Sequence, residues 1–279
     1  MSKPGKLRAW LVLARASNLP TVWSNCVAGC WLGGWNSLAT VFLICLTGSL
    51  FYTGGMFLND FCDVGFDREY KHERPIVTGQ LTRQQVGLAA LVLFIAGLLL
   101  ALEIAPNVLV FGVILVIVIT AYDFLHKRIA WAPLLMAACR FLLYLMAAVA
   151  GVLGLTTRAF GFAIGLALYV VGLSYLARGE SRVAHTSTVW LAFLFAPILV
   201  ALVFHVSWIS LACALPLLFW ICRALAVAKE NVGRGVAALL AGIVLVDLLA
   251  VSPISLLLWI VFAGLFGAAL LFQRYVPAT

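Results

Sequence analysis

Residues 39–67 read ATVFLICLTGSLFYTGGMFLNDFCDVGFD, an uncharged apolar run followed at once by an amide and three carboxylates. An apolar run of about 18 residues or more is long enough to cross a bilayer as a helix. The uncharged part, 39–58, meets that length, so the polar cluster after it is expected at the boundary between membrane and water. This stretch predicts a membrane helix that ends in a polar site.

The rest of the chain repeats the apolar pattern. Of its 279 residues, 65% are hydrophobic and only 10% are charged, whereas soluble domains are about half apolar and a quarter charged. A soluble enzyme with a single anchor is therefore excluded, and we predict one all-α domain over 1–279, a polytopic membrane bundle of nine to ten transmembrane helices. A four-helix repeat over about 39–154 and 159–250 is possible. The expected spans are 20–36, 39–58, 84–103, 106–122, 131–154, 159–177, 188–204, 207–225, 235–250 and 254–273.

The cations fall on one side of this division. Of the 18 Lys and Arg residues, all except Arg140 and Arg158 lie before the first span, after the last, or in the loops that leave even-numbered spans. Because positive loops stay on the cytoplasmic side, both termini and the long loops of this integral membrane protein are expected in the cytoplasm. The net charge of +8 is explained by this topology and by contact with membrane lipids, which are the expected partners. No nucleic-acid partner is needed to explain it.

The polar cluster comprises Asn59, Asp60, Asp63 and Asp67. At about 100° per residue all four side chains fall on one helical stripe about 100° wide. Three carboxylates so placed repel one another near a low-dielectric membrane, so a cation should neutralise them. Mg²⁺ is the expected cation, because it prefers oxygen ligands and its coordination shell is commonly completed by substrate phosphates. The alternative is a solvated acidic helix end, although helix C-termini disfavour anions.

Basic residues follow the acids directly, at Arg68, Lys71 and Arg74. Metal-binding acids beside cations that grip phosphate oxygens are typical of a diphosphate site. Lys71 and Arg74 are alternatively plain anchors at the cytoplasmic face. The turn-forming and capping residues expected in this loop are Pro75, Gly79 and either Thr78 or Thr82.

Two sets of residues resemble a known family. The pattern NDxxDxxxD over 59–67, with Glu73-Arg74-Pro75-Ile76 and Gly79 behind it, resembles the first signature of the UbiA superfamily of intramembrane prenyltransferases. The segments YDFLHKR at 122–128 and MAACR at 136–140 resemble a bacterial UbiA-like branch that includes EboC-like proteins. The resemblance implies an all-helical fold, usually of nine spans, with a central cavity under cytoplasmic loops that opens sideways to lipid. It also implies transfer of a prenyl group from an isoprenoid diphosphate.

The same resemblance implies roles for single residues. Lys127 would help neutralise the leaving diphosphate, and Tyr122 would stabilise positive charge on the allylic carbon, unless it is an interfacial aromatic anchor. The diphosphate would be held through Mg²⁺ by Asn59, Asp60, Asp63 and Asp67.

Further polar residues lie inside or beside the expected spans. Arg140 is expected within a span, which favours a functional role in substrate binding, although a structural pair with Asp123 is the alternative. Asp123 itself belongs to the expected substrate-binding set. Asn18 and Asn25 are expected to contact the acceptor or the diphosphate, or else to hydrogen-bond between helices. Asp247 is assigned no role.

The sequence departs from the family where a second aspartate cluster is expected, after the sixth span. Residues 173–182 read LSYLARGESR, in which only Glu180 is acidic. Either one metal ion is bound instead of two, with Arg178 or Arg182 supplying the charge of the second, or the chemistry has changed. Arg178 and Glu180 join the expected substrate-binding set.

The function predicted from these residues is Mg²⁺-dependent transfer of a prenyl group to a hydrophobic or amphipathic acceptor. The thinned second motif leaves a lipid or prenyl-diphosphate binding protein, with weak or no catalysis, as the alternative. A secondary transporter would need discontinuous helices at mid-membrane depth, and the charged cluster at the membrane edge disfavours it.

Overall fold

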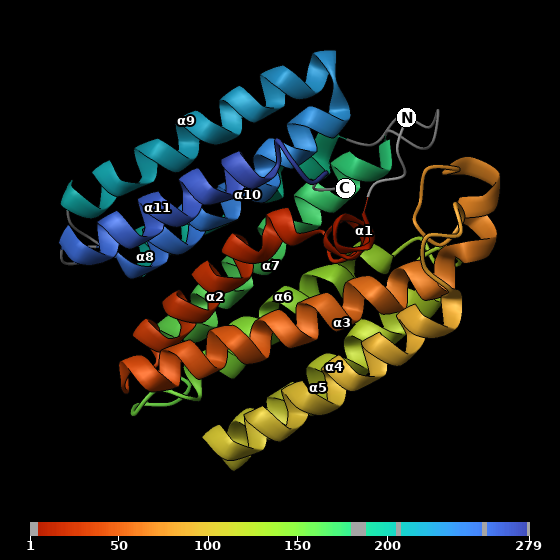
Figure 1. The fold of residues 1–279 in the computed structure, drawn as a ribbon. Helices are drawn as coiled ribbons and strands as arrows, with labels where there is room; N and C mark the ends of the chain where they lie inside the picture. The colour runs from red at the N-terminus through yellow and green to blue at the C-terminus, as the bar shows by residue number, and fades with distance from the viewer. Residues whose placement is uncertain (1–4, 180–187, 205–207, 253–255, 278–279) are drawn as a thin grey trace.

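The computed structural model describes residues 5–179, 188–204, 208–252 and 256–277, and every regular element in them is a helix (Figure 1). The all-α prediction is therefore confirmed for the described part of the chain. Short 3-10 segments cover Ala16–Asn18 and Thr188–Phe195. The α-helices are α1 (Lys6–Leu13), α2 (Leu19–Leu32), α3 (Leu38–Tyr70), α4 (Arg83–Ile104), α5 (Pro106–Leu125), α6 (Ala132–Ala148), α7 (Thr157–Gly179), α8 (Ala196–Phe204), α9 (Trp208–Glu230), α10 (Val232–Val251) and α11 (Leu256–Phe272).

Each expected span has a helical counterpart. Among the described residues, the five helices α3, α4, α5, α7 and α10 are long and apolar enough to cross a membrane. Helices α6 and α11 and the segment Val189–Phe204 are apolar but shorter. The protein is accordingly an integral membrane protein, while a total of nine to ten crossings stays a prediction.

Helix α3 continues well past the expected end of its span at residue 58. Its 33 residues correspond to about 50 Å at 1.5 Å each, against about 30 Å for the hydrocarbon core of a bilayer. The acidic cluster therefore lies on the last turns of a helix, and only 71–82 form the loop beyond it. The helix tolerates these acids because cations from other segments pair with them.

The loop 71–82 has the turn chemistry expected of it. Gly79 has a φ of +73°, a left-handed conformation that side chains disfavour. Thr82 caps α4 by accepting a hydrogen bond from the backbone N–H of Gln85, whose side chain accepts one from Thr82 in return. The capping prediction is confirmed for Thr82. The loop thus holds the start of α4 beside the end of α3.

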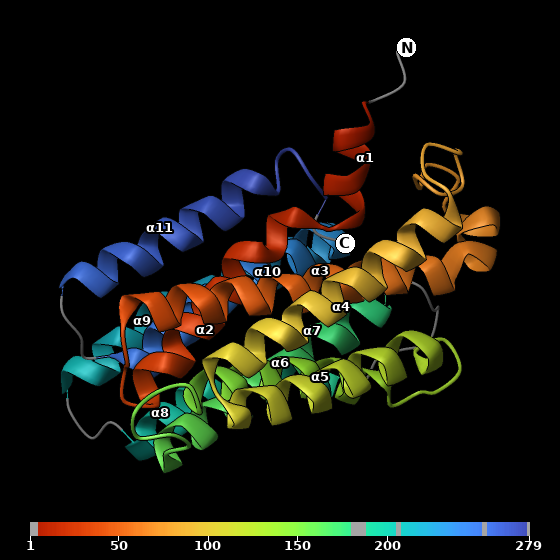
Figure 2. The same ribbon diagram turned by 60° about the horizontal axis from the view of Figure 1, so that its bottom comes forward.

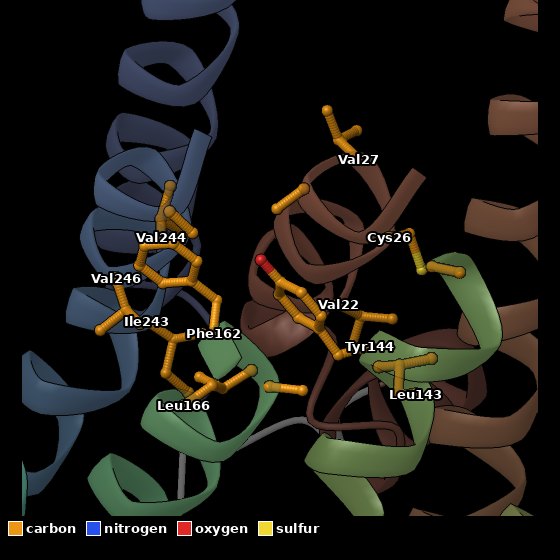
Figure 3. Close-up of a cluster of buried hydrophobic side chains, with 14 of the residues drawn as sticks. Val22, Cys26, Val27, Leu143, Tyr144, Phe162, Leu166, Ile243, Val244 and Val246 are labelled. Carbon is orange, nitrogen blue, oxygen red and sulfur yellow. The ribbon is translucent and has the colours of Figure 1, made fainter. Parts of the chain in front are cut away.

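Helix α2 links the two sides of the bundle. Figure 1 shows α3, α4 and α5 on one side and α9, α10 and α11 on the other, and Figure 2 shows the same helices after a turn of 60°. Helix α2 contacts α3, α6 and α10, and α7 packs on both α6 and α10. Figure 3 shows the core that they share, including Val22, Tyr144, Phe162 and Ile243, each with at most 1% of its surface exposed.

Small residues allow α2 to lie almost against α6. A Cβ added at Gly29 would stand 2.6 Å from the carbonyl oxygen of Tyr144. A Cβ at Gly33 would overlap the carbonyl group of Ala148. Close backbone approach through small residues is the usual way in which membrane helices pack. This contact fixes α2 and α6, the two helices that carry the deeper polar groups of the site.

Candidate functional site

A cavity of about 720 Å³ lies between α3, α5, α6, α7 and α10. Most of its wall is apolar, as at Phe51, Leu115, Val170 and Ile243. One end is different, because the cations Arg15, Lys71, Lys127 and Arg178 line it where α3, α5 and α7 finish and α2 begins. We call these four residues the cationic end. Among the described lining residues Asp123 is the single carboxylate, so the cavity favours an anionic head attached to an apolar body.

Arg15 connects the cavity to the acidic cluster. It has a φ of +43°, an unfavourable left-handed conformation for a residue with a side chain, and such strain is often found at functional sites. Its Nη2 donates to Asn59 Oδ1 at 3.2 Å and lies 3.8 Å from Asp60 Oδ1. The hydroxyl of Tyr52, which also lines the cavity, donates to the Arg15 carbonyl at 3.4 Å. Both the side chain and the backbone carbonyl of Arg15 are therefore held by residues of α3.

Asn59 and Asp60 of the polar cluster are buried beside Asp123, a buried residue of α5. Asn59 Nδ2 donates to Asp123 Oδ1 at 3.1 Å, so both ends of the Asn59 amide are engaged. Asp60 Oδ1 lies 3.8 Å from the guanidinium groups of both Arg15 and Arg74. Within the described residues, Asp60 Oδ2 and Asp123 Oδ2 are buried and accept no hydrogen bond. Each carboxylate thus keeps one oxygen that lacks a partner.

Asp63 is paired with the segment that follows α5. Lys127 Nζ lies 2.7 Å from Asp63 Oδ1, and His126 Nε2 lies 3.4 Å from Oδ2. The Lys127 ammonium also lies 3.9 Å from the centre of the Phe66 ring, within range of a cation–π interaction. Tyr122 lines the cavity one turn earlier, with its ring stacked on that of His126. The structure therefore brings Tyr122 and Lys127 together with the acidic stripe.

Asp67 and the cations near it complete this end of the site. Asp67 is 5% exposed, and Arg74, at 8%, turns back from the loop toward Asp60. Burial lowers the pKa of Lys71 from its usual value, and the positive charges of Arg74 and Arg15 lower it further. Like charges so crowded gain from a bound anion, which favours a phosphate ligand at the cationic end.

The acidic cluster has the donor chemistry for Mg²⁺, but it does not form a complete cage. The described residues contain no group of three or more His, Cys, Asp or Glu side chains close enough to hold a metal ion by themselves. Magnesium commonly takes one or two carboxylates and completes its shell with water and substrate phosphates. The partnerless oxygen of Asp60 and the buried carboxylate of Asp67 fit that demand.

The second expected motif is present only in part. Arg178 lines the cavity, but its guanidinium also donates to the backbone carbonyls of His126, Ile129 and Ala130 at 2.6 to 3.2 Å. It thereby holds the segment that carries Lys127. Glu180 and Arg182 lie outside the described residues.

The other predicted residues differ in whether they line the cavity and at what depth. Arg68 is exposed in the last turn of α3 and does not line the cavity. Asn18 is buried and does line it. Arg140 lines the cavity at greater depth, where it bonds to Asn25 and Thr21. No ion pair joins Arg140 to Asp123 in the described structure, so the alternative structural pair is not formed.

Sequence reasoning did not select three residues of the site, Arg15, His126 and Tyr52. In the sequence, Arg15 looks like a topogenic charge, since it stands just before the first apolar run. His126 lies inside the segment 122–128 that carries the second resemblance, so its position was a usable signal. Tyr52 sits in an apolar run and carries no local signal.

A charged end that opens onto a long apolar chamber, inside an all-α membrane bundle, defines a class of protein that holds an amphiphile with an anionic head. The comparisons with known proteins narrow that class. The model of the UbiA prenyltransferase family matches residues 17–232. The chain therefore belongs to the UbiA prenyltransferase family.

Named relatives match over shorter segments. The chain is 36% identical over 106 residues to a digeranylgeranylglyceryl phosphate synthase from Ignicoccus hospitalis, covering 38% of this chain and 35% of that protein. It is 33% identical over 93 residues to a 4-hydroxybenzoate octaprenyltransferase from Methylobacillus flagellatus, covering 32% and 30%. The matched segments thus span about a third of each relative.

Solved structures show the same fold over nearly the whole chain. A UbiA homologue from Archaeoglobus fulgidus, bound to GPP and Mg²⁺, superposes with a TM-score of 0.57 at 15% identity and covers 96% of this chain and 97% of that one. A structure of digeranylgeranylglyceryl phosphate synthase gives a TM-score of 0.58 at 19% identity, with coverage of 95% and 98%. At these identities the likeness establishes the fold alone.

Proposed function

We propose that the protein transfers a prenyl group from an isoprenoid diphosphate to an acceptor within the membrane, and that it requires Mg²⁺. The single observation that carries the proposal is the cavity, whose cationic end contacts the acidic stripe of α3 while its body is apolar. The headgroup and the tail of a prenyl diphosphate match these two parts. The related structure bound to GPP and Mg²⁺ supports the same pairing of ligand and ion.

The acids and cations would share the work of binding. Asp60, Asp63 and Asp67, with Asn59, are the residues that would hold Mg²⁺, and this ion supplies positive charge to the diphosphate when bound. Lys127 and Arg15 hold positive charge beside the leaving group, where negative charge grows as the allylic bond breaks. Their ion pairs with Asp63 and Asp60 fix them in that position.

The remaining lining residues would protect and guide the allylic cation. Tyr122 presents an aromatic ring close to the cationic end, where it can stabilise positive charge on the departing carbon. The apolar wall around Phe51 and Val170 excludes water and accommodates the prenyl tail. Arg178 holds the backbone around His126 and so keeps Lys127 in place. We place this end of the bundle on the cytoplasmic side of the membrane, as the distribution of cations predicts. A bacterial inner membrane is proposed from the resemblance of residues 122–128 and 136–140 to a bacterial branch of the family.

The experiment is incubation of the purified full chain with radiolabelled farnesyl or geranylgeranyl diphosphate, Mg²⁺ and a panel of acceptors. Release of pyrophosphate together with label on an acceptor supports transfer. Label retained as intact diphosphate would instead support the binding protein that the thinned second motif allows. Absence of Mg²⁺-dependent binding would contradict both.

A further inference from the structure

A second polar site lies deeper in the cavity, at Arg140. This residue is eight positions after the start of α6 at Ala132, which is about 12 Å along the helix at 1.5 Å per residue. Most of the residues that line the cavity, such as Leu143, Leu240 and Ile243, are apolar. A guanidinium in such surroundings is costly unless something compensates its charge.

Protein contacts use only part of the Arg140 guanidinium. Its Nη1 donates to Asn25 Oδ1 at 2.8 Å and to the Thr21 carbonyl at 3.3 Å, and its Nη2 donates to Thr21 Oγ1 at 3.0 Å. All three acceptors are neutral and belong to α2. Arginine has five N–H donors, so two have no partner among the described residues. Arg140 lines the cavity beside Tyr52, whose ring centre lies 5.9 Å from the guanidinium carbon, and a ligand in this part of the cavity would use these two donors.

Asp247 fixes the acceptor on which Arg140 rests. It is fully buried on α10, and its Oδ2 accepts hydrogen bonds from Ser24 Oγ at 2.5 Å and Asn25 Nδ2 at 2.7 Å. With its NH₂ group held by Asp247, the Asn25 amide must turn its oxygen toward Arg140. No direct ion pair joins Asp247 and Arg140 in the described residues. Asp247 therefore offsets the arginine charge from a distance and leaves the side facing the cavity available.

We propose that Arg140 binds an anionic group, a carboxylate or a phosphate, on the acceptor, and that Asp247 is a positioning residue acting on it through Asn25. This inference rests on the proposed function. The prenyl diphosphate has its own cations at the cationic end, where Arg178 donates to Ala130 beside the start of α6, and Arg140 lies about 12 Å along α6 from that start, so a second anion at Arg140 belongs to the other substrate. An acceptor held there by its anionic group presents its opposite end, which carries the nucleophile, toward the allylic carbon.

The test compares matched probes on the purified full chain in detergent. Equilibrium dialysis measures binding of 4-hydroxybenzoate, its neutral methyl ester and phenyl phosphate. The wild-type protein is expected to bind at least one of the two anions about tenfold or more tightly than the ester, as a charge-assisted hydrogen bond implies. Comparison of the carboxylate with the phosphate identifies the group. Equal affinity for all three probes, or no measurable anion binding, would overturn the proposal.

Variants assign the preference to its residues. Arg140→Gln should abolish the difference between anion and ester, and Asp247→Asn should reduce it, whereas Arg223→Gln, an exposed change on α9, should leave it intact. If Arg140→Gln does not fold, Arg140→Lys replaces it and is expected to retain only part of the preference. A full preference in either Arg140 variant overturns the proposal.

Binding of pyrophosphate with Mg²⁺ is measured on the same samples and should not change in Arg140→Gln or Asp247→Asn. If the wild-type protein does not bind pyrophosphate with Mg²⁺, the proposed function fails. If it binds pyrophosphate but shows no preference for the anionic probes, only the role of Arg140 fails. If pyrophosphate binding falls in these two variants by as much as the preference for the anionic probes does, the fold is damaged in general and the specific role of Arg140 is refuted.

Discussion

Replacement of Lys127 by Gln tests the cationic end most sharply. Lys127 Nζ lies 2.7 Å from Asp63 Oδ1 and 3.9 Å from the centre of the Phe66 ring, and its side chain is 34% exposed. For a partly exposed ion pair and cation–π contact, the expected loss of folding stability is about 1 kcal/mol. The loss of a charge-assisted hydrogen bond to a bound phosphate costs more, about 1.5–3 kcal/mol of binding free energy. The affinity for the diphosphate should therefore fall about ten- to hundredfold.

The assay is Mg²⁺-dependent binding of farnesyl diphosphate, followed together with thermal unfolding. Arg128→Gln is the matched control, because it removes a positive charge from the neighbouring residue. The Arg128 side chain is exposed and does not line the cavity. Lys127→Arg should restore much of the affinity, since it keeps the charge. Equal affinities for wild type, Lys127→Gln and Arg128→Gln would refute the reasoning.

Two further outcomes follow from the contacts. Asp67→Ala should abolish Mg²⁺-dependent diphosphate binding while Asp247→Asn has little effect on it, and isothermal titration with pyrophosphate checks this; similar losses in both would show fold damage instead. Gly33→Ala should lower the unfolding temperature, because its Cβ would overlap the Ala148 carbonyl, at a cost of about 1–3 kcal/mol. Gly267→Ala, with open space around it, is the control, and an equal shift in both would contradict the packing argument.

The helices could be predicted from the sequence because apolar runs of membrane length leave little choice of structure. The end of α3 could not, since a helix carrying three acids past residue 58 is stable only if distant cations neutralise it. Those partners, Arg15 from the N-terminal segment and Lys127 from the segment after α5, carry no local mark of the pairing. The membrane side of each loop and the internal repeat remain predictions.

The candidate site shows the same division. The stripe formed by Asn59, Asp60 and Asp67 could be predicted from helical geometry, and the structure buries all three at 3–5% exposure. The link from Arg140 through Asn25 to Asp247 joins residues up to 222 positions apart, so only the packing of α2 on α6 and α10 shows it. Asp247, which had no predicted role, thereby becomes part of a polar network.

The most direct measurement is anomalous X-ray diffraction from crystals grown with Mn²⁺ in place of Mg²⁺ and a non-hydrolysable farnesyl diphosphate analogue. The account predicts an ion peak bound by oxygens of the 59–67 stripe and by the diphosphate, with the prenyl tail in the apolar cavity. A diphosphate bound elsewhere, or an ion that none of these carboxylates touches, would contradict it.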